Sequence, residues 1–435
     1  MNGYRPLTAL PRELLDRPDL KAALAHHDFG TVFFLARAEA GISYSKIASE
    51  CDIKPERIGT LAKGHGSVTT FDKIVRIVDA LRIPGHMVGL APRPWESSAD
   101  ADADSSGGGV QRRGFLKATT TAGLGASLPE LVRAPSTGSR VGSDTPQRLR
   151  QRTARLRRLD EVLGGGDTYR IYLAEYHSTR ALLRDGSYTE ETGRELLSVL
   201  AEQAQQAGWA AFDGGRHAEA RGLYQASHKA AQEAKDAQLA GNALAFLAYQ
   251  QLPTERQVAV QVAARSCATA GPYAAPGVRA LLYERLAWAH AVADQPTETE
   301  RALEAARDAL TEVDDTPQPD WASWVDATEL QIMSGRCWTE LGRPLRAVPV
   351  LESALAKFDN RHARDKSLYL SWLANSYLQA GEVEQAAVVS DLALDLSSGV
   401  ASVRPRERLG PVLKRLAEHR TLPQVAALLE KIPAH

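Results

Sequence analysis

The sequence predicts an all-α protein made of two helical domains joined by a flexible linker. Apolar residues recur with helical spacing over residues 31–90 and almost throughout residues 148–435, which is typical of amphipathic helices. Nowhere does the chain show the sustained apolar–polar alternation, rich in β-branched side chains, that indicates strands. We therefore expect helices alone to build both cores.

Composition divides the chain into three parts. Residues 96–147 are rich in Ser, Ala, Asp, Gly, Thr and Pro, a composition that cannot bury enough apolar surface to order itself. We assign residues 1–95 to an N-terminal domain, residues 96–147 to a flexible linker and residues 148–435 to a C-terminal domain. A length of 435 residues also favours more than one domain.

Charge and cysteine usage narrow the function classes. The 52 Lys and Arg nearly balance the 53 Asp and Glu, so attraction to nucleic acid or to a membrane has to be local. Cys51, Cys267 and Cys337 lie far apart, which argues against a disulfide framework or a zinc cluster and fits a reducing compartment. No apolar run approaches the ~20 residues of a membrane-spanning helix. We expect a cytoplasmic protein without a cofactor or metal.

The N-terminal domain is expected to contain five helices. Gly41 suits the end of the first helix, and the side chain of Ser43 suits the N-cap of the second. Pro55 suits the first position of the third helix, because its missing N–H would be unpaired there anyway, and Gly64 ends that helix. The expected helices cover residues 31–41, 43–51, 55–64, 71–83 and 84–91.

The stretches "ISYSKIASECDIKPERIGTLAKG" and "FDKIVRIVDALRIP" resemble the XRE (Cro/repressor-type) helix-turn-helix family. The resemblance implies that the helix starting at Pro55 enters the major groove of DNA. Asp52 stands in the turn where the family usually has Gly, and Asp tolerates a left-handed backbone better than most residues. The expected core residues are Ile47, Ala48, Ile53, Ile58 and Leu61, and, on the fourth helix, Ile74, Val75, Ile77, Val78 and Leu81.

The resemblance also assigns the residues that would contact DNA. The positions nearest the bases are Pro55, Glu56, Gly59 and Thr60, and none is an Arg, Gln or Asn. Glu56 could accept from the cytosine amino group, and Thr60 could hydrogen-bond a base or touch a thymine methyl. Candidate phosphate contacts are Lys46, Lys54, Arg57, Lys63 and His65, with Ser43, Tyr44 and Ser45 as neutral donors. The alternative is a helical bundle that uses the same fold to bind protein.

The C-terminal domain contains a repeated pattern of six residues whose spacing is the same in every copy. We number these six template positions in chain order. Small residues at such fixed points let paired helices approach closely. The copies are Gly208, Ala211, Gly215, Ala220, Tyr224, Ser227; Gly335, Trp338, Gly342, Ala347, Leu351, Ala354; and Ala374, Tyr377, Gly381, Ala386, Ser390, Ala393.

This pattern resembles the tetratricopeptide repeat (TPR) over roughly residues 165–430. The resemblance implies an α-solenoid of helix pairs, whose usual role is to offer a groove to a peptide or a face to another subunit. We therefore expect no enzyme activity and an unknown effector, which is a peptide, a protein or a small molecule. Trp321 and Trp324 are expected to pack in the core or between repeats rather than to form a ligand cage.

Two further segments leave alternatives open. Residues 148–159, "RLRQRTARLRRL", are expected to form an amphipathic helix. In one alternative its arginines are a solvated face and its leucines pack on the array. In the other the helix is a DNA-backbone contact or a dimer seam.

Residues 111–127, "QRRGFLKATTTAGLGAS", match a twin-arginine export pattern. We interpret this segment as an interdomain latch in the cytoplasm; the alternative is an export or membrane signal.

Together these features predict a sequence-specific, DNA-binding transcriptional regulator. Its partners are double-stranded DNA and the effector of the TPR-like domain, and it is expected to be a homodimer, because one small helix-turn-helix domain reads only a half-site. The alternative is a TPR scaffold protein whose helix-turn-helix domain no longer reads DNA.

Overall fold

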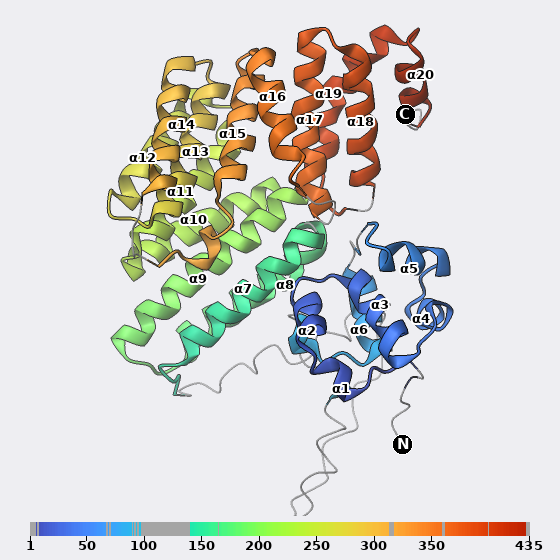
Figure 1. The fold of residues 1–435 in the computed structure, drawn as a ribbon. Helices are drawn as coiled ribbons and strands as arrows, with labels where there is room; N and C mark the ends of the chain where they lie inside the picture. Colours follow the sequence, from blue (N-terminus) through green and yellow to red (C-terminus); the bar gives the residue numbers. More distant parts are fainter. Residues whose placement is uncertain are drawn as a thin grey trace, which may run out of the picture. The chain divides into compact units, whose positions relative to one another are not determined.

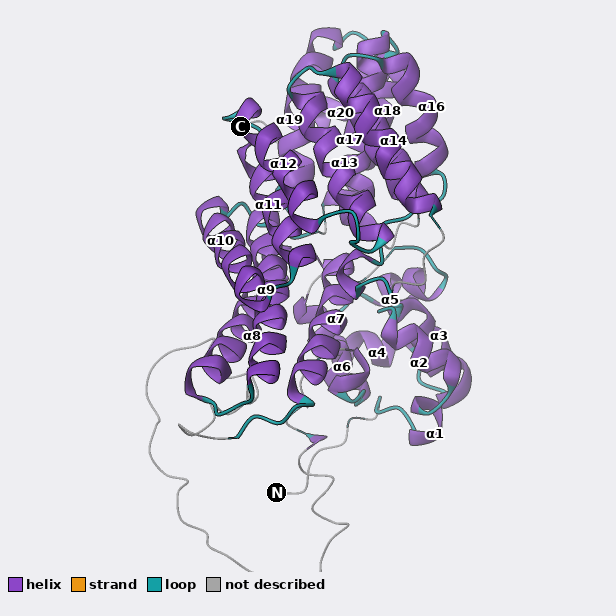
Figure 2. Ribbon diagram, turned by 90° about the vertical axis from the view of Figure 1, so that its left-hand side faces the viewer, coloured by secondary structure: helices purple, strands orange, loops and turns teal. Residues whose placement is uncertain are grey.

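All regular secondary structure described in the computed structural model is helical (Figure 2), which confirms the all-α prediction. The described part of the chain falls into two compact units, the first with α1–α6 and η1 and the second with α7–α20. The twin-arginine-like segment at 111–127 lies outside the described residues. Those residues are 6, 8–66, 68, 71–88, 90, 93, 95–96, 140–163, 165–312, 317–358, 362–398 and 400–431.

The first unit contains the four longer helices that the sequence predicts and two short helices that it does not. The fifth predicted helix is a single turn of 3-10 helix, η1. The two additional helices, α1 and α2, precede the predicted set. The elements are α1 (Arg12–Leu15), α2 (Pro18–Ala25), α3 (Phe29–Ala40), α4 (Tyr44–Cys51), α5 (Pro55–Ala62), α6 (Phe71–Leu81) and η1 (Gly85–Val88).

Local sequence signals set the ends of these helices. Gly41 ends α3 in the left-handed region, with φ 65°. The Ser43 hydroxyl oxygen accepts the Lys46 amide at the start of α4, and Asp52 ends α4 with φ 53° and ψ 48°. Pro55 occupies the first turn of α5. The turn between α4 and α5 therefore has the left-handed backbone that the sequence predicts at Asp52.

The core of the first unit follows the predicted apolar positions with two exceptions. Ile53 and Val75 are half-buried rather than buried, because Ile53 lies in the turn after α4 and Val75 lies beside the core face of α6. Helices α3 and α5 approach closely where a Cβ on Gly30 would lie 2.3 Å from the carbonyl oxygen of Leu61. The other predicted core residues are buried: Ile47, Ala48, Ile58, Leu61, Ile74, Ile77, Val78 and Leu81.

The second unit is a succession of helix pairs that stand side by side in chain order (Figure 1). Its first helix, α7, begins three residues before the predicted boundary at 148. The elements are α7 (Thr145–Leu163), α8 (Gly165–Asp185), α9 (Glu190–Asp213), α10 (His217–Ala234), α11 (Ala237–Gln251), α12 (Arg256–Ala270), α13 (Pro276–Val292), α14 (Pro296–Thr311), η4 (Asp320–Ala322), α15 (Ala327–Glu340), α16 (Pro344–Leu355), α17 (Ala363–Ala380), α18 (Val383–Ser397), α19 (Arg404–Leu416), η6 (Ala417–His419) and α20 (Pro423–Glu430).

The three copies of the sequence pattern coincide with the pairs α9–α10, α15–α16 and α17–α18. The glycine at the third template position lies in the turn of each pair with a positive φ, between 64° and 86°. This backbone conformation favours glycine because it has no Cβ. The fourth and sixth positions are fully buried in every copy: Ala220, Ser227, Ala347, Ala354, Ala386 and Ala393.

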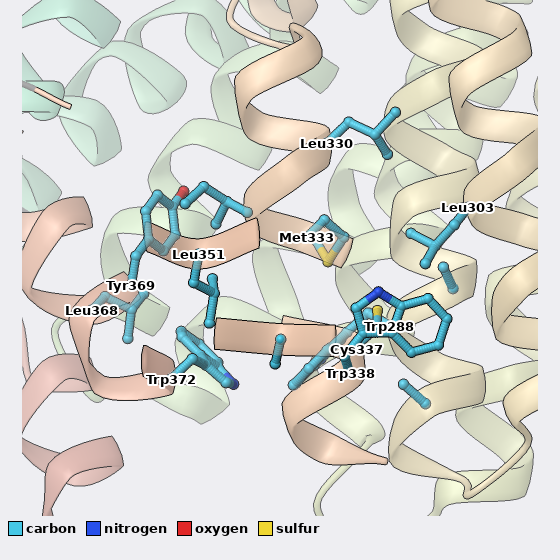
Figure 3. Packing of buried hydrophobic residues seen from close by; sticks show 14 of the residues in the cluster. Trp288, Leu303, Leu330, Met333, Cys337, Trp338, Leu351, Leu368, Tyr369 and Trp372 are labelled. Carbon is cyan, nitrogen blue, oxygen red and sulfur yellow. The ribbon is translucent and has the colours of Figure 1, made fainter. Parts of the chain in front are cut away.

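The largest buried cluster of the second unit joins α11–α19 (Figure 3). Trp288, Trp338 and Trp372 lie within it, together with Met333 and Cys337. Trp288 and Trp372 meet edge to face, with ring centroids 5.8 Å apart, an arrangement favoured by the ring quadrupoles.

Polar contacts join the segment before α19 to the beginning of the array. The Gly166 amide donates to the Ala401 carbonyl (2.9 Å), and the Val403 amide donates to the Asp213 carbonyl (3.0 Å). The buried Asp213 carboxylate accepts from the Ser402 hydroxyl (2.8 Å) and from the Gly165 amide (2.9 Å). The last helix pairs are therefore anchored to α8 and α9, and the first helices of the pairs surround a common interior.

Candidate functional site

Helices α4 and α5 and their flanking turns bring the ten predicted DNA-binding residues together. All are exposed except Tyr44, which is half-buried beneath Arg37, whose guanidinium carbon lies 4.6 Å from the centroid of the Tyr44 ring. Within the described chain, Lys46, Lys54 and Lys63 take part in no ion pair. The ten residues are Ser43, Tyr44, Ser45, Lys46, Lys54, Glu56, Arg57, Thr60, Lys63 and His65.

Two contacts modify this surface. The Thr60 hydroxyl donates to the Glu56 carbonyl (2.8 Å), so its proton is used within α5 while its oxygen can still accept. Asp52, the acidic residue in the turn, is paired with Arg76 of α6 (2.5 Å). Since that pair offsets the negative charge of the turn, the lysines around α5 keep most of their attraction for an anion.

The arginine-rich helix α7 packs its leucines on the array, which is one of the two alternatives predicted from the sequence. Leu149 and Leu156 are buried, and several of its arginines face carboxylates of the same unit. These ion pairs are Arg150 with Glu195, Arg152 with Glu175, Arg157 with Glu202 and Asp320, and Arg158 with Asp320. Arginines paired in this way are less available for DNA phosphates.

A cavity of about 330 Å³ lies inside the second unit. It is lined by α7, α8, the first helix of each later pair from α9 to α19, η4 and the segments that precede α15 and α17. None of its lining residues comes from α10, α12, α14, α16 or α18. The interior surface therefore draws on residues spread over nearly 250 positions of the chain, from Arg157 to Arg404.

Five arginines and three carboxylates line this cavity. Two of the arginines have close carboxylate partners: Arg157 pairs with Glu202, and Arg364 pairs with Asp365 (2.9 Å). Arg404 makes a longer contact of 3.4 Å with Asp213. The other two, Arg285 and Arg336, form no ion pair with any residue that the structure describes. The wall of the cavity thus carries an excess of positive charge.

Aromatic rings lie against the arginines. The guanidinium carbon of Arg404 is 4.5 Å from the centroid of the Trp209 ring, and that of Arg285 is 5.2 Å from the Tyr249 ring. Arg336 lies 4.2 Å from the Trp372 ring and 4.7 Å from the Trp288 ring. Such cation–π contacts hold a guanidinium by its face.

The cations change the ionisation of Tyr249, which lies behind the cavity wall. Burial acts to raise the pKa of its phenol, but the charges of Arg404, Arg336 and Arg285 outweigh burial and lower the pKa to about 7. Arg336 also directs one N–H at the phenol oxygen (3.5 Å). The shift of this tyrosine indicates a strongly positive local potential.

Two buried glutamates in this region hold their protons more tightly than usual. Burial raises the pKa of Glu329 to about 7, against the opposing effects of Arg336 and of the Tyr369 hydroxyl, which donates to both carboxylate oxygens (2.9 and 3.0 Å). Burial, with the charge of Glu329, raises the pKa of Glu284 well above its usual value. These acids therefore neutralise less of the arginine charge than their number suggests.

The structure changes the interpretation of Trp321 and Trp324. Trp321 packs against apolar residues of three neighbouring clusters, as the sequence predicts. Trp324 is 40% exposed, and both rings line the cavity. The expectation is confirmed for Trp321 but not for Trp324, because the turn after η4 leaves the Trp324 ring partly exposed beside the first helices of the pairs.

The arginines of the cavity were not predicted from the sequence, although the repeat contains a signal for some of the residues that line it. Trp209 and Arg336 each follow the first template position, Gly208 and Gly335. That glycine faces the second helix of its own pair, so the next residue, about 100° further round the helix, points to another side. In both copies that side is the cavity.

The sequence matches no protein-family model and no curated protein. None of the helices in the described ranges combines the length and the apolar character needed to cross a membrane. Among the described residues, no three His, Cys, Asp or Glu side chains are grouped so that they could hold a metal ion.

Proposed function

We propose that the protein is a sequence-specific DNA-binding regulator of transcription that acts in the cytoplasm as a homodimer. In this proposal the first unit is an XRE-like helix-turn-helix domain and α5 is its recognition helix. The second unit is a TPR-like array that senses an effector. The observation that carries the proposal is the left-handed turn at Asp52 between two short helices, adjoined by an exposed surface whose lysines form no ion pair with any described residue.

The chemistry of the α5 surface supports phosphate contacts more than base contacts. Lys46, Lys54 and Lys63 are exposed and without ion pairs in the described chain, so each can release counterions on binding DNA. Glu56 and Thr60 are the exposed polar residues at the base-reading positions. This set predicts affinity that falls steeply with salt and a modest preference among sequences.

The second unit supports a sensing role through its cavity. Its volume falls at the lower end of the range of small-molecule sites, and it is lined by cations and aromatic rings drawn from the repeats. A ligand bound there would contact several helix pairs at once, which is how a binding event can change the curvature of an array.

Selection of duplexes from a random DNA library by the full-length protein tests the proposal. We expect one enriched motif with two half-sites, and an affinity whose logarithm falls linearly with the logarithm of salt concentration. Lys63→Ala should reduce retention on the selected duplex, whereas Lys229→Ala, an exposed lysine of α10, should not. If no duplex is enriched, the alternative of a scaffold protein that does not read DNA is correct.

A further inference from the structure

Arg336 on α15 is a buried cation whose nearest acids, Glu329 and Glu284, have raised pKa values. It is 2% exposed, its Nε has no hydrogen-bond partner, and no carboxylate of the described chain forms an ion pair with it. Removing a charged group from water costs free energy unless an opposite charge or hydrogen bonds replace the water. Its neighbour Arg285 on α13 is half-buried and equally unpaired, and burial lowers its pKa, with Arg336 adding to that effect.

Arg404, the first residue of α19, brings a third guanidinium to the cavity wall. Its contact with Asp213 is long, at 3.4 Å, and that carboxylate already accepts from Ser402 and Gly165. Arg404 therefore shares its only carboxylate partner among the described residues. Three helices that are distant in sequence thus direct cations at one interior surface.

Two other arginines of the cavity wall are paired directly with carboxylates. Arg157 contacts Glu202 on α9 and Asp320 on η4, and Arg364 makes two hydrogen bonds to Asp365. Arg285 and Arg336 have no such partner among the described residues and lie instead on the faces of Tyr249, Trp288 and Trp372. A guanidinium held by its face leaves its N–H edge for an acceptor.

We propose that the cavity of the second unit binds a small organic anion whose carboxylate or phosphate group is held by Arg285, Arg336 and Arg404. The aromatic lining, which includes Trp209, Phe246 and the exposed ring of Trp324, takes a flat apolar part of the same ligand. The cavity volume of about 330 Å³ suits a small organic molecule with one aromatic ring and one anionic group. The proposal rests on the sensing role proposed above and is independent of DNA binding.

Thermal melting of the full-length protein with defined probes tests this site at constant ionic strength. Inorganic phosphate should raise the melting temperature relative to chloride, because a ligand that binds only the folded state stabilises it. Phenyl phosphate should reach the same effect at a roughly tenfold lower concentration, since its ring adds apolar and stacking contacts. Benzoate carries a carboxylate in place of the phosphate. Comparing the melting temperature in benzoate with that in phenyl phosphate therefore identifies the anionic group that the site prefers.

A neutral probe and a peptide probe can contradict the proposal of a site for a small organic anion. Benzyl alcohol has the ring but no charge and should leave the melting temperature unchanged. An equal response to benzyl alcohol and to phenyl phosphate would show that charge is not recognised, and would overturn the proposal. So would stabilisation by a tetra-alanine peptide with a free carboxylate in the absence of any response to phenyl phosphate or benzoate.

Variants of the arginines separate binding from a structural role. The double variant Arg285→Gln, Arg336→Gln removes two unpaired, mutually repelling charges, so without ligand it should melt at the same temperature as the native chain or higher. It should also lose the response to phosphate and phenyl phosphate. Arg307→Gln, on the exposed side of α14, is the matched control and should keep the response.

A variant that melts lower without ligand yet still responds to phosphate would assign these arginines to structure and refute the site. If the double variant is too unstable to measure, Arg285→Gln alone is used, because the half-buried Arg285 side chain is easier to replace. This variant too should lose the rise in melting temperature with phosphate and phenyl phosphate. Selection of DNA duplexes tests the proposed DNA binding separately. If the protein selects DNA but its melting temperature does not respond to these anions, the anion site is refuted and the proposed DNA binding is not.

Discussion

Gly335 on α15 packs directly against the side chain of Leu351 on α16, and a Cβ on this glycine would lie 2.4 Å from Cγ of the leucine. Gly208 and Tyr224 have the same relationship in the pair α9–α10, with a distance of 2.6 Å to the ring. The two residues are the first and fifth positions of the repeated pattern. The repeat therefore encodes the closest approach of the two helices in a pair.

This packing predicts the effect of adding one methyl group. Gly335→Ala should destabilise the second unit by about 1–3 kcal/mol, because Leu351 is fully buried and cannot move aside without disturbing its neighbours. Gly222→Ala is the control: it lies within α10 with open space around its Cβ position, and it should stabilise by up to ~1 kcal/mol through helix propensity. Urea denaturation measures both, and equal effects would contradict the packing argument.

Phosphate contacts around α5 predict a uniform loss of DNA affinity. Arg57→Ala and Lys63→Ala should each weaken binding to every duplex and flatten the slope of log affinity against log salt by about one unit. Fluorescence anisotropy with a selected and an unrelated duplex measures this. A loss confined to the selected duplex would place these side chains at bases instead, and Lys229→Ala should leave both affinities unchanged.

Thr60 predicts a different kind of change. Its hydroxyl proton is used by the Glu56 carbonyl, so its oxygen and methyl group are what it can offer to a base. Thr60→Ala should therefore alter which duplexes are selected from a random library while leaving the salt slope as it is. Ser45→Ala, a candidate phosphate donor, should lower affinity without changing the selected motif. Identical motifs from Thr60→Ala and the native chain would exclude base reading by this residue.

Glu329 predicts a pH-dependent stability of the second unit. Its pKa is raised from 4.5 to about 7 in the folded protein, so between these pH values the folded state holds a proton that the unfolded state has released. Stability therefore falls as pH rises through this range. One pKa unit corresponds to ~1.4 kcal/mol, so the shift predicts a loss of roughly 3 kcal/mol between pH 4.5 and pH 8.

Urea denaturation of two variants isolates this contribution. Glu329→Gln is neutral at every pH, so the fall in its free energy of unfolding between pH 4.5 and pH 8 should be smaller than that of the native chain by that amount. Glu304→Gln, exposed on α14, should behave like the native chain. The groups that act on Glu329 include Arg336, Tyr369, Asp365 and Arg285, and Glu284 also lies within range of its charge. Parallel pH profiles for the native chain and Glu329→Gln would contradict a raised pKa.

Sequence by itself determined the features that depend on a few neighbouring residues. The cap at Ser43, the left-handed turn at Asp52 and the turn glycines of the pairs, such as Gly342, follow from local backbone preferences, which act over about four residues. The repeated pattern also determined which small residues are buried between paired helices. Helices α1 and α2 escaped prediction, because α1 has only four residues and α2 carries a weak apolar stripe.

Only the tertiary structure decided the interior of the second unit. Nothing in the local pattern around Arg285 or Arg404 distinguishes them from surface arginines, and the repeat gives only the side of α15 on which Arg336 lies. They meet because the array brings the segment before α19 back to α8 and α9, where Asp213 anchors it. That return depends on small rotations accumulated over successive helix pairs, which no short window of sequence contains, and so this cluster of three arginines becomes visible only when the whole array is folded.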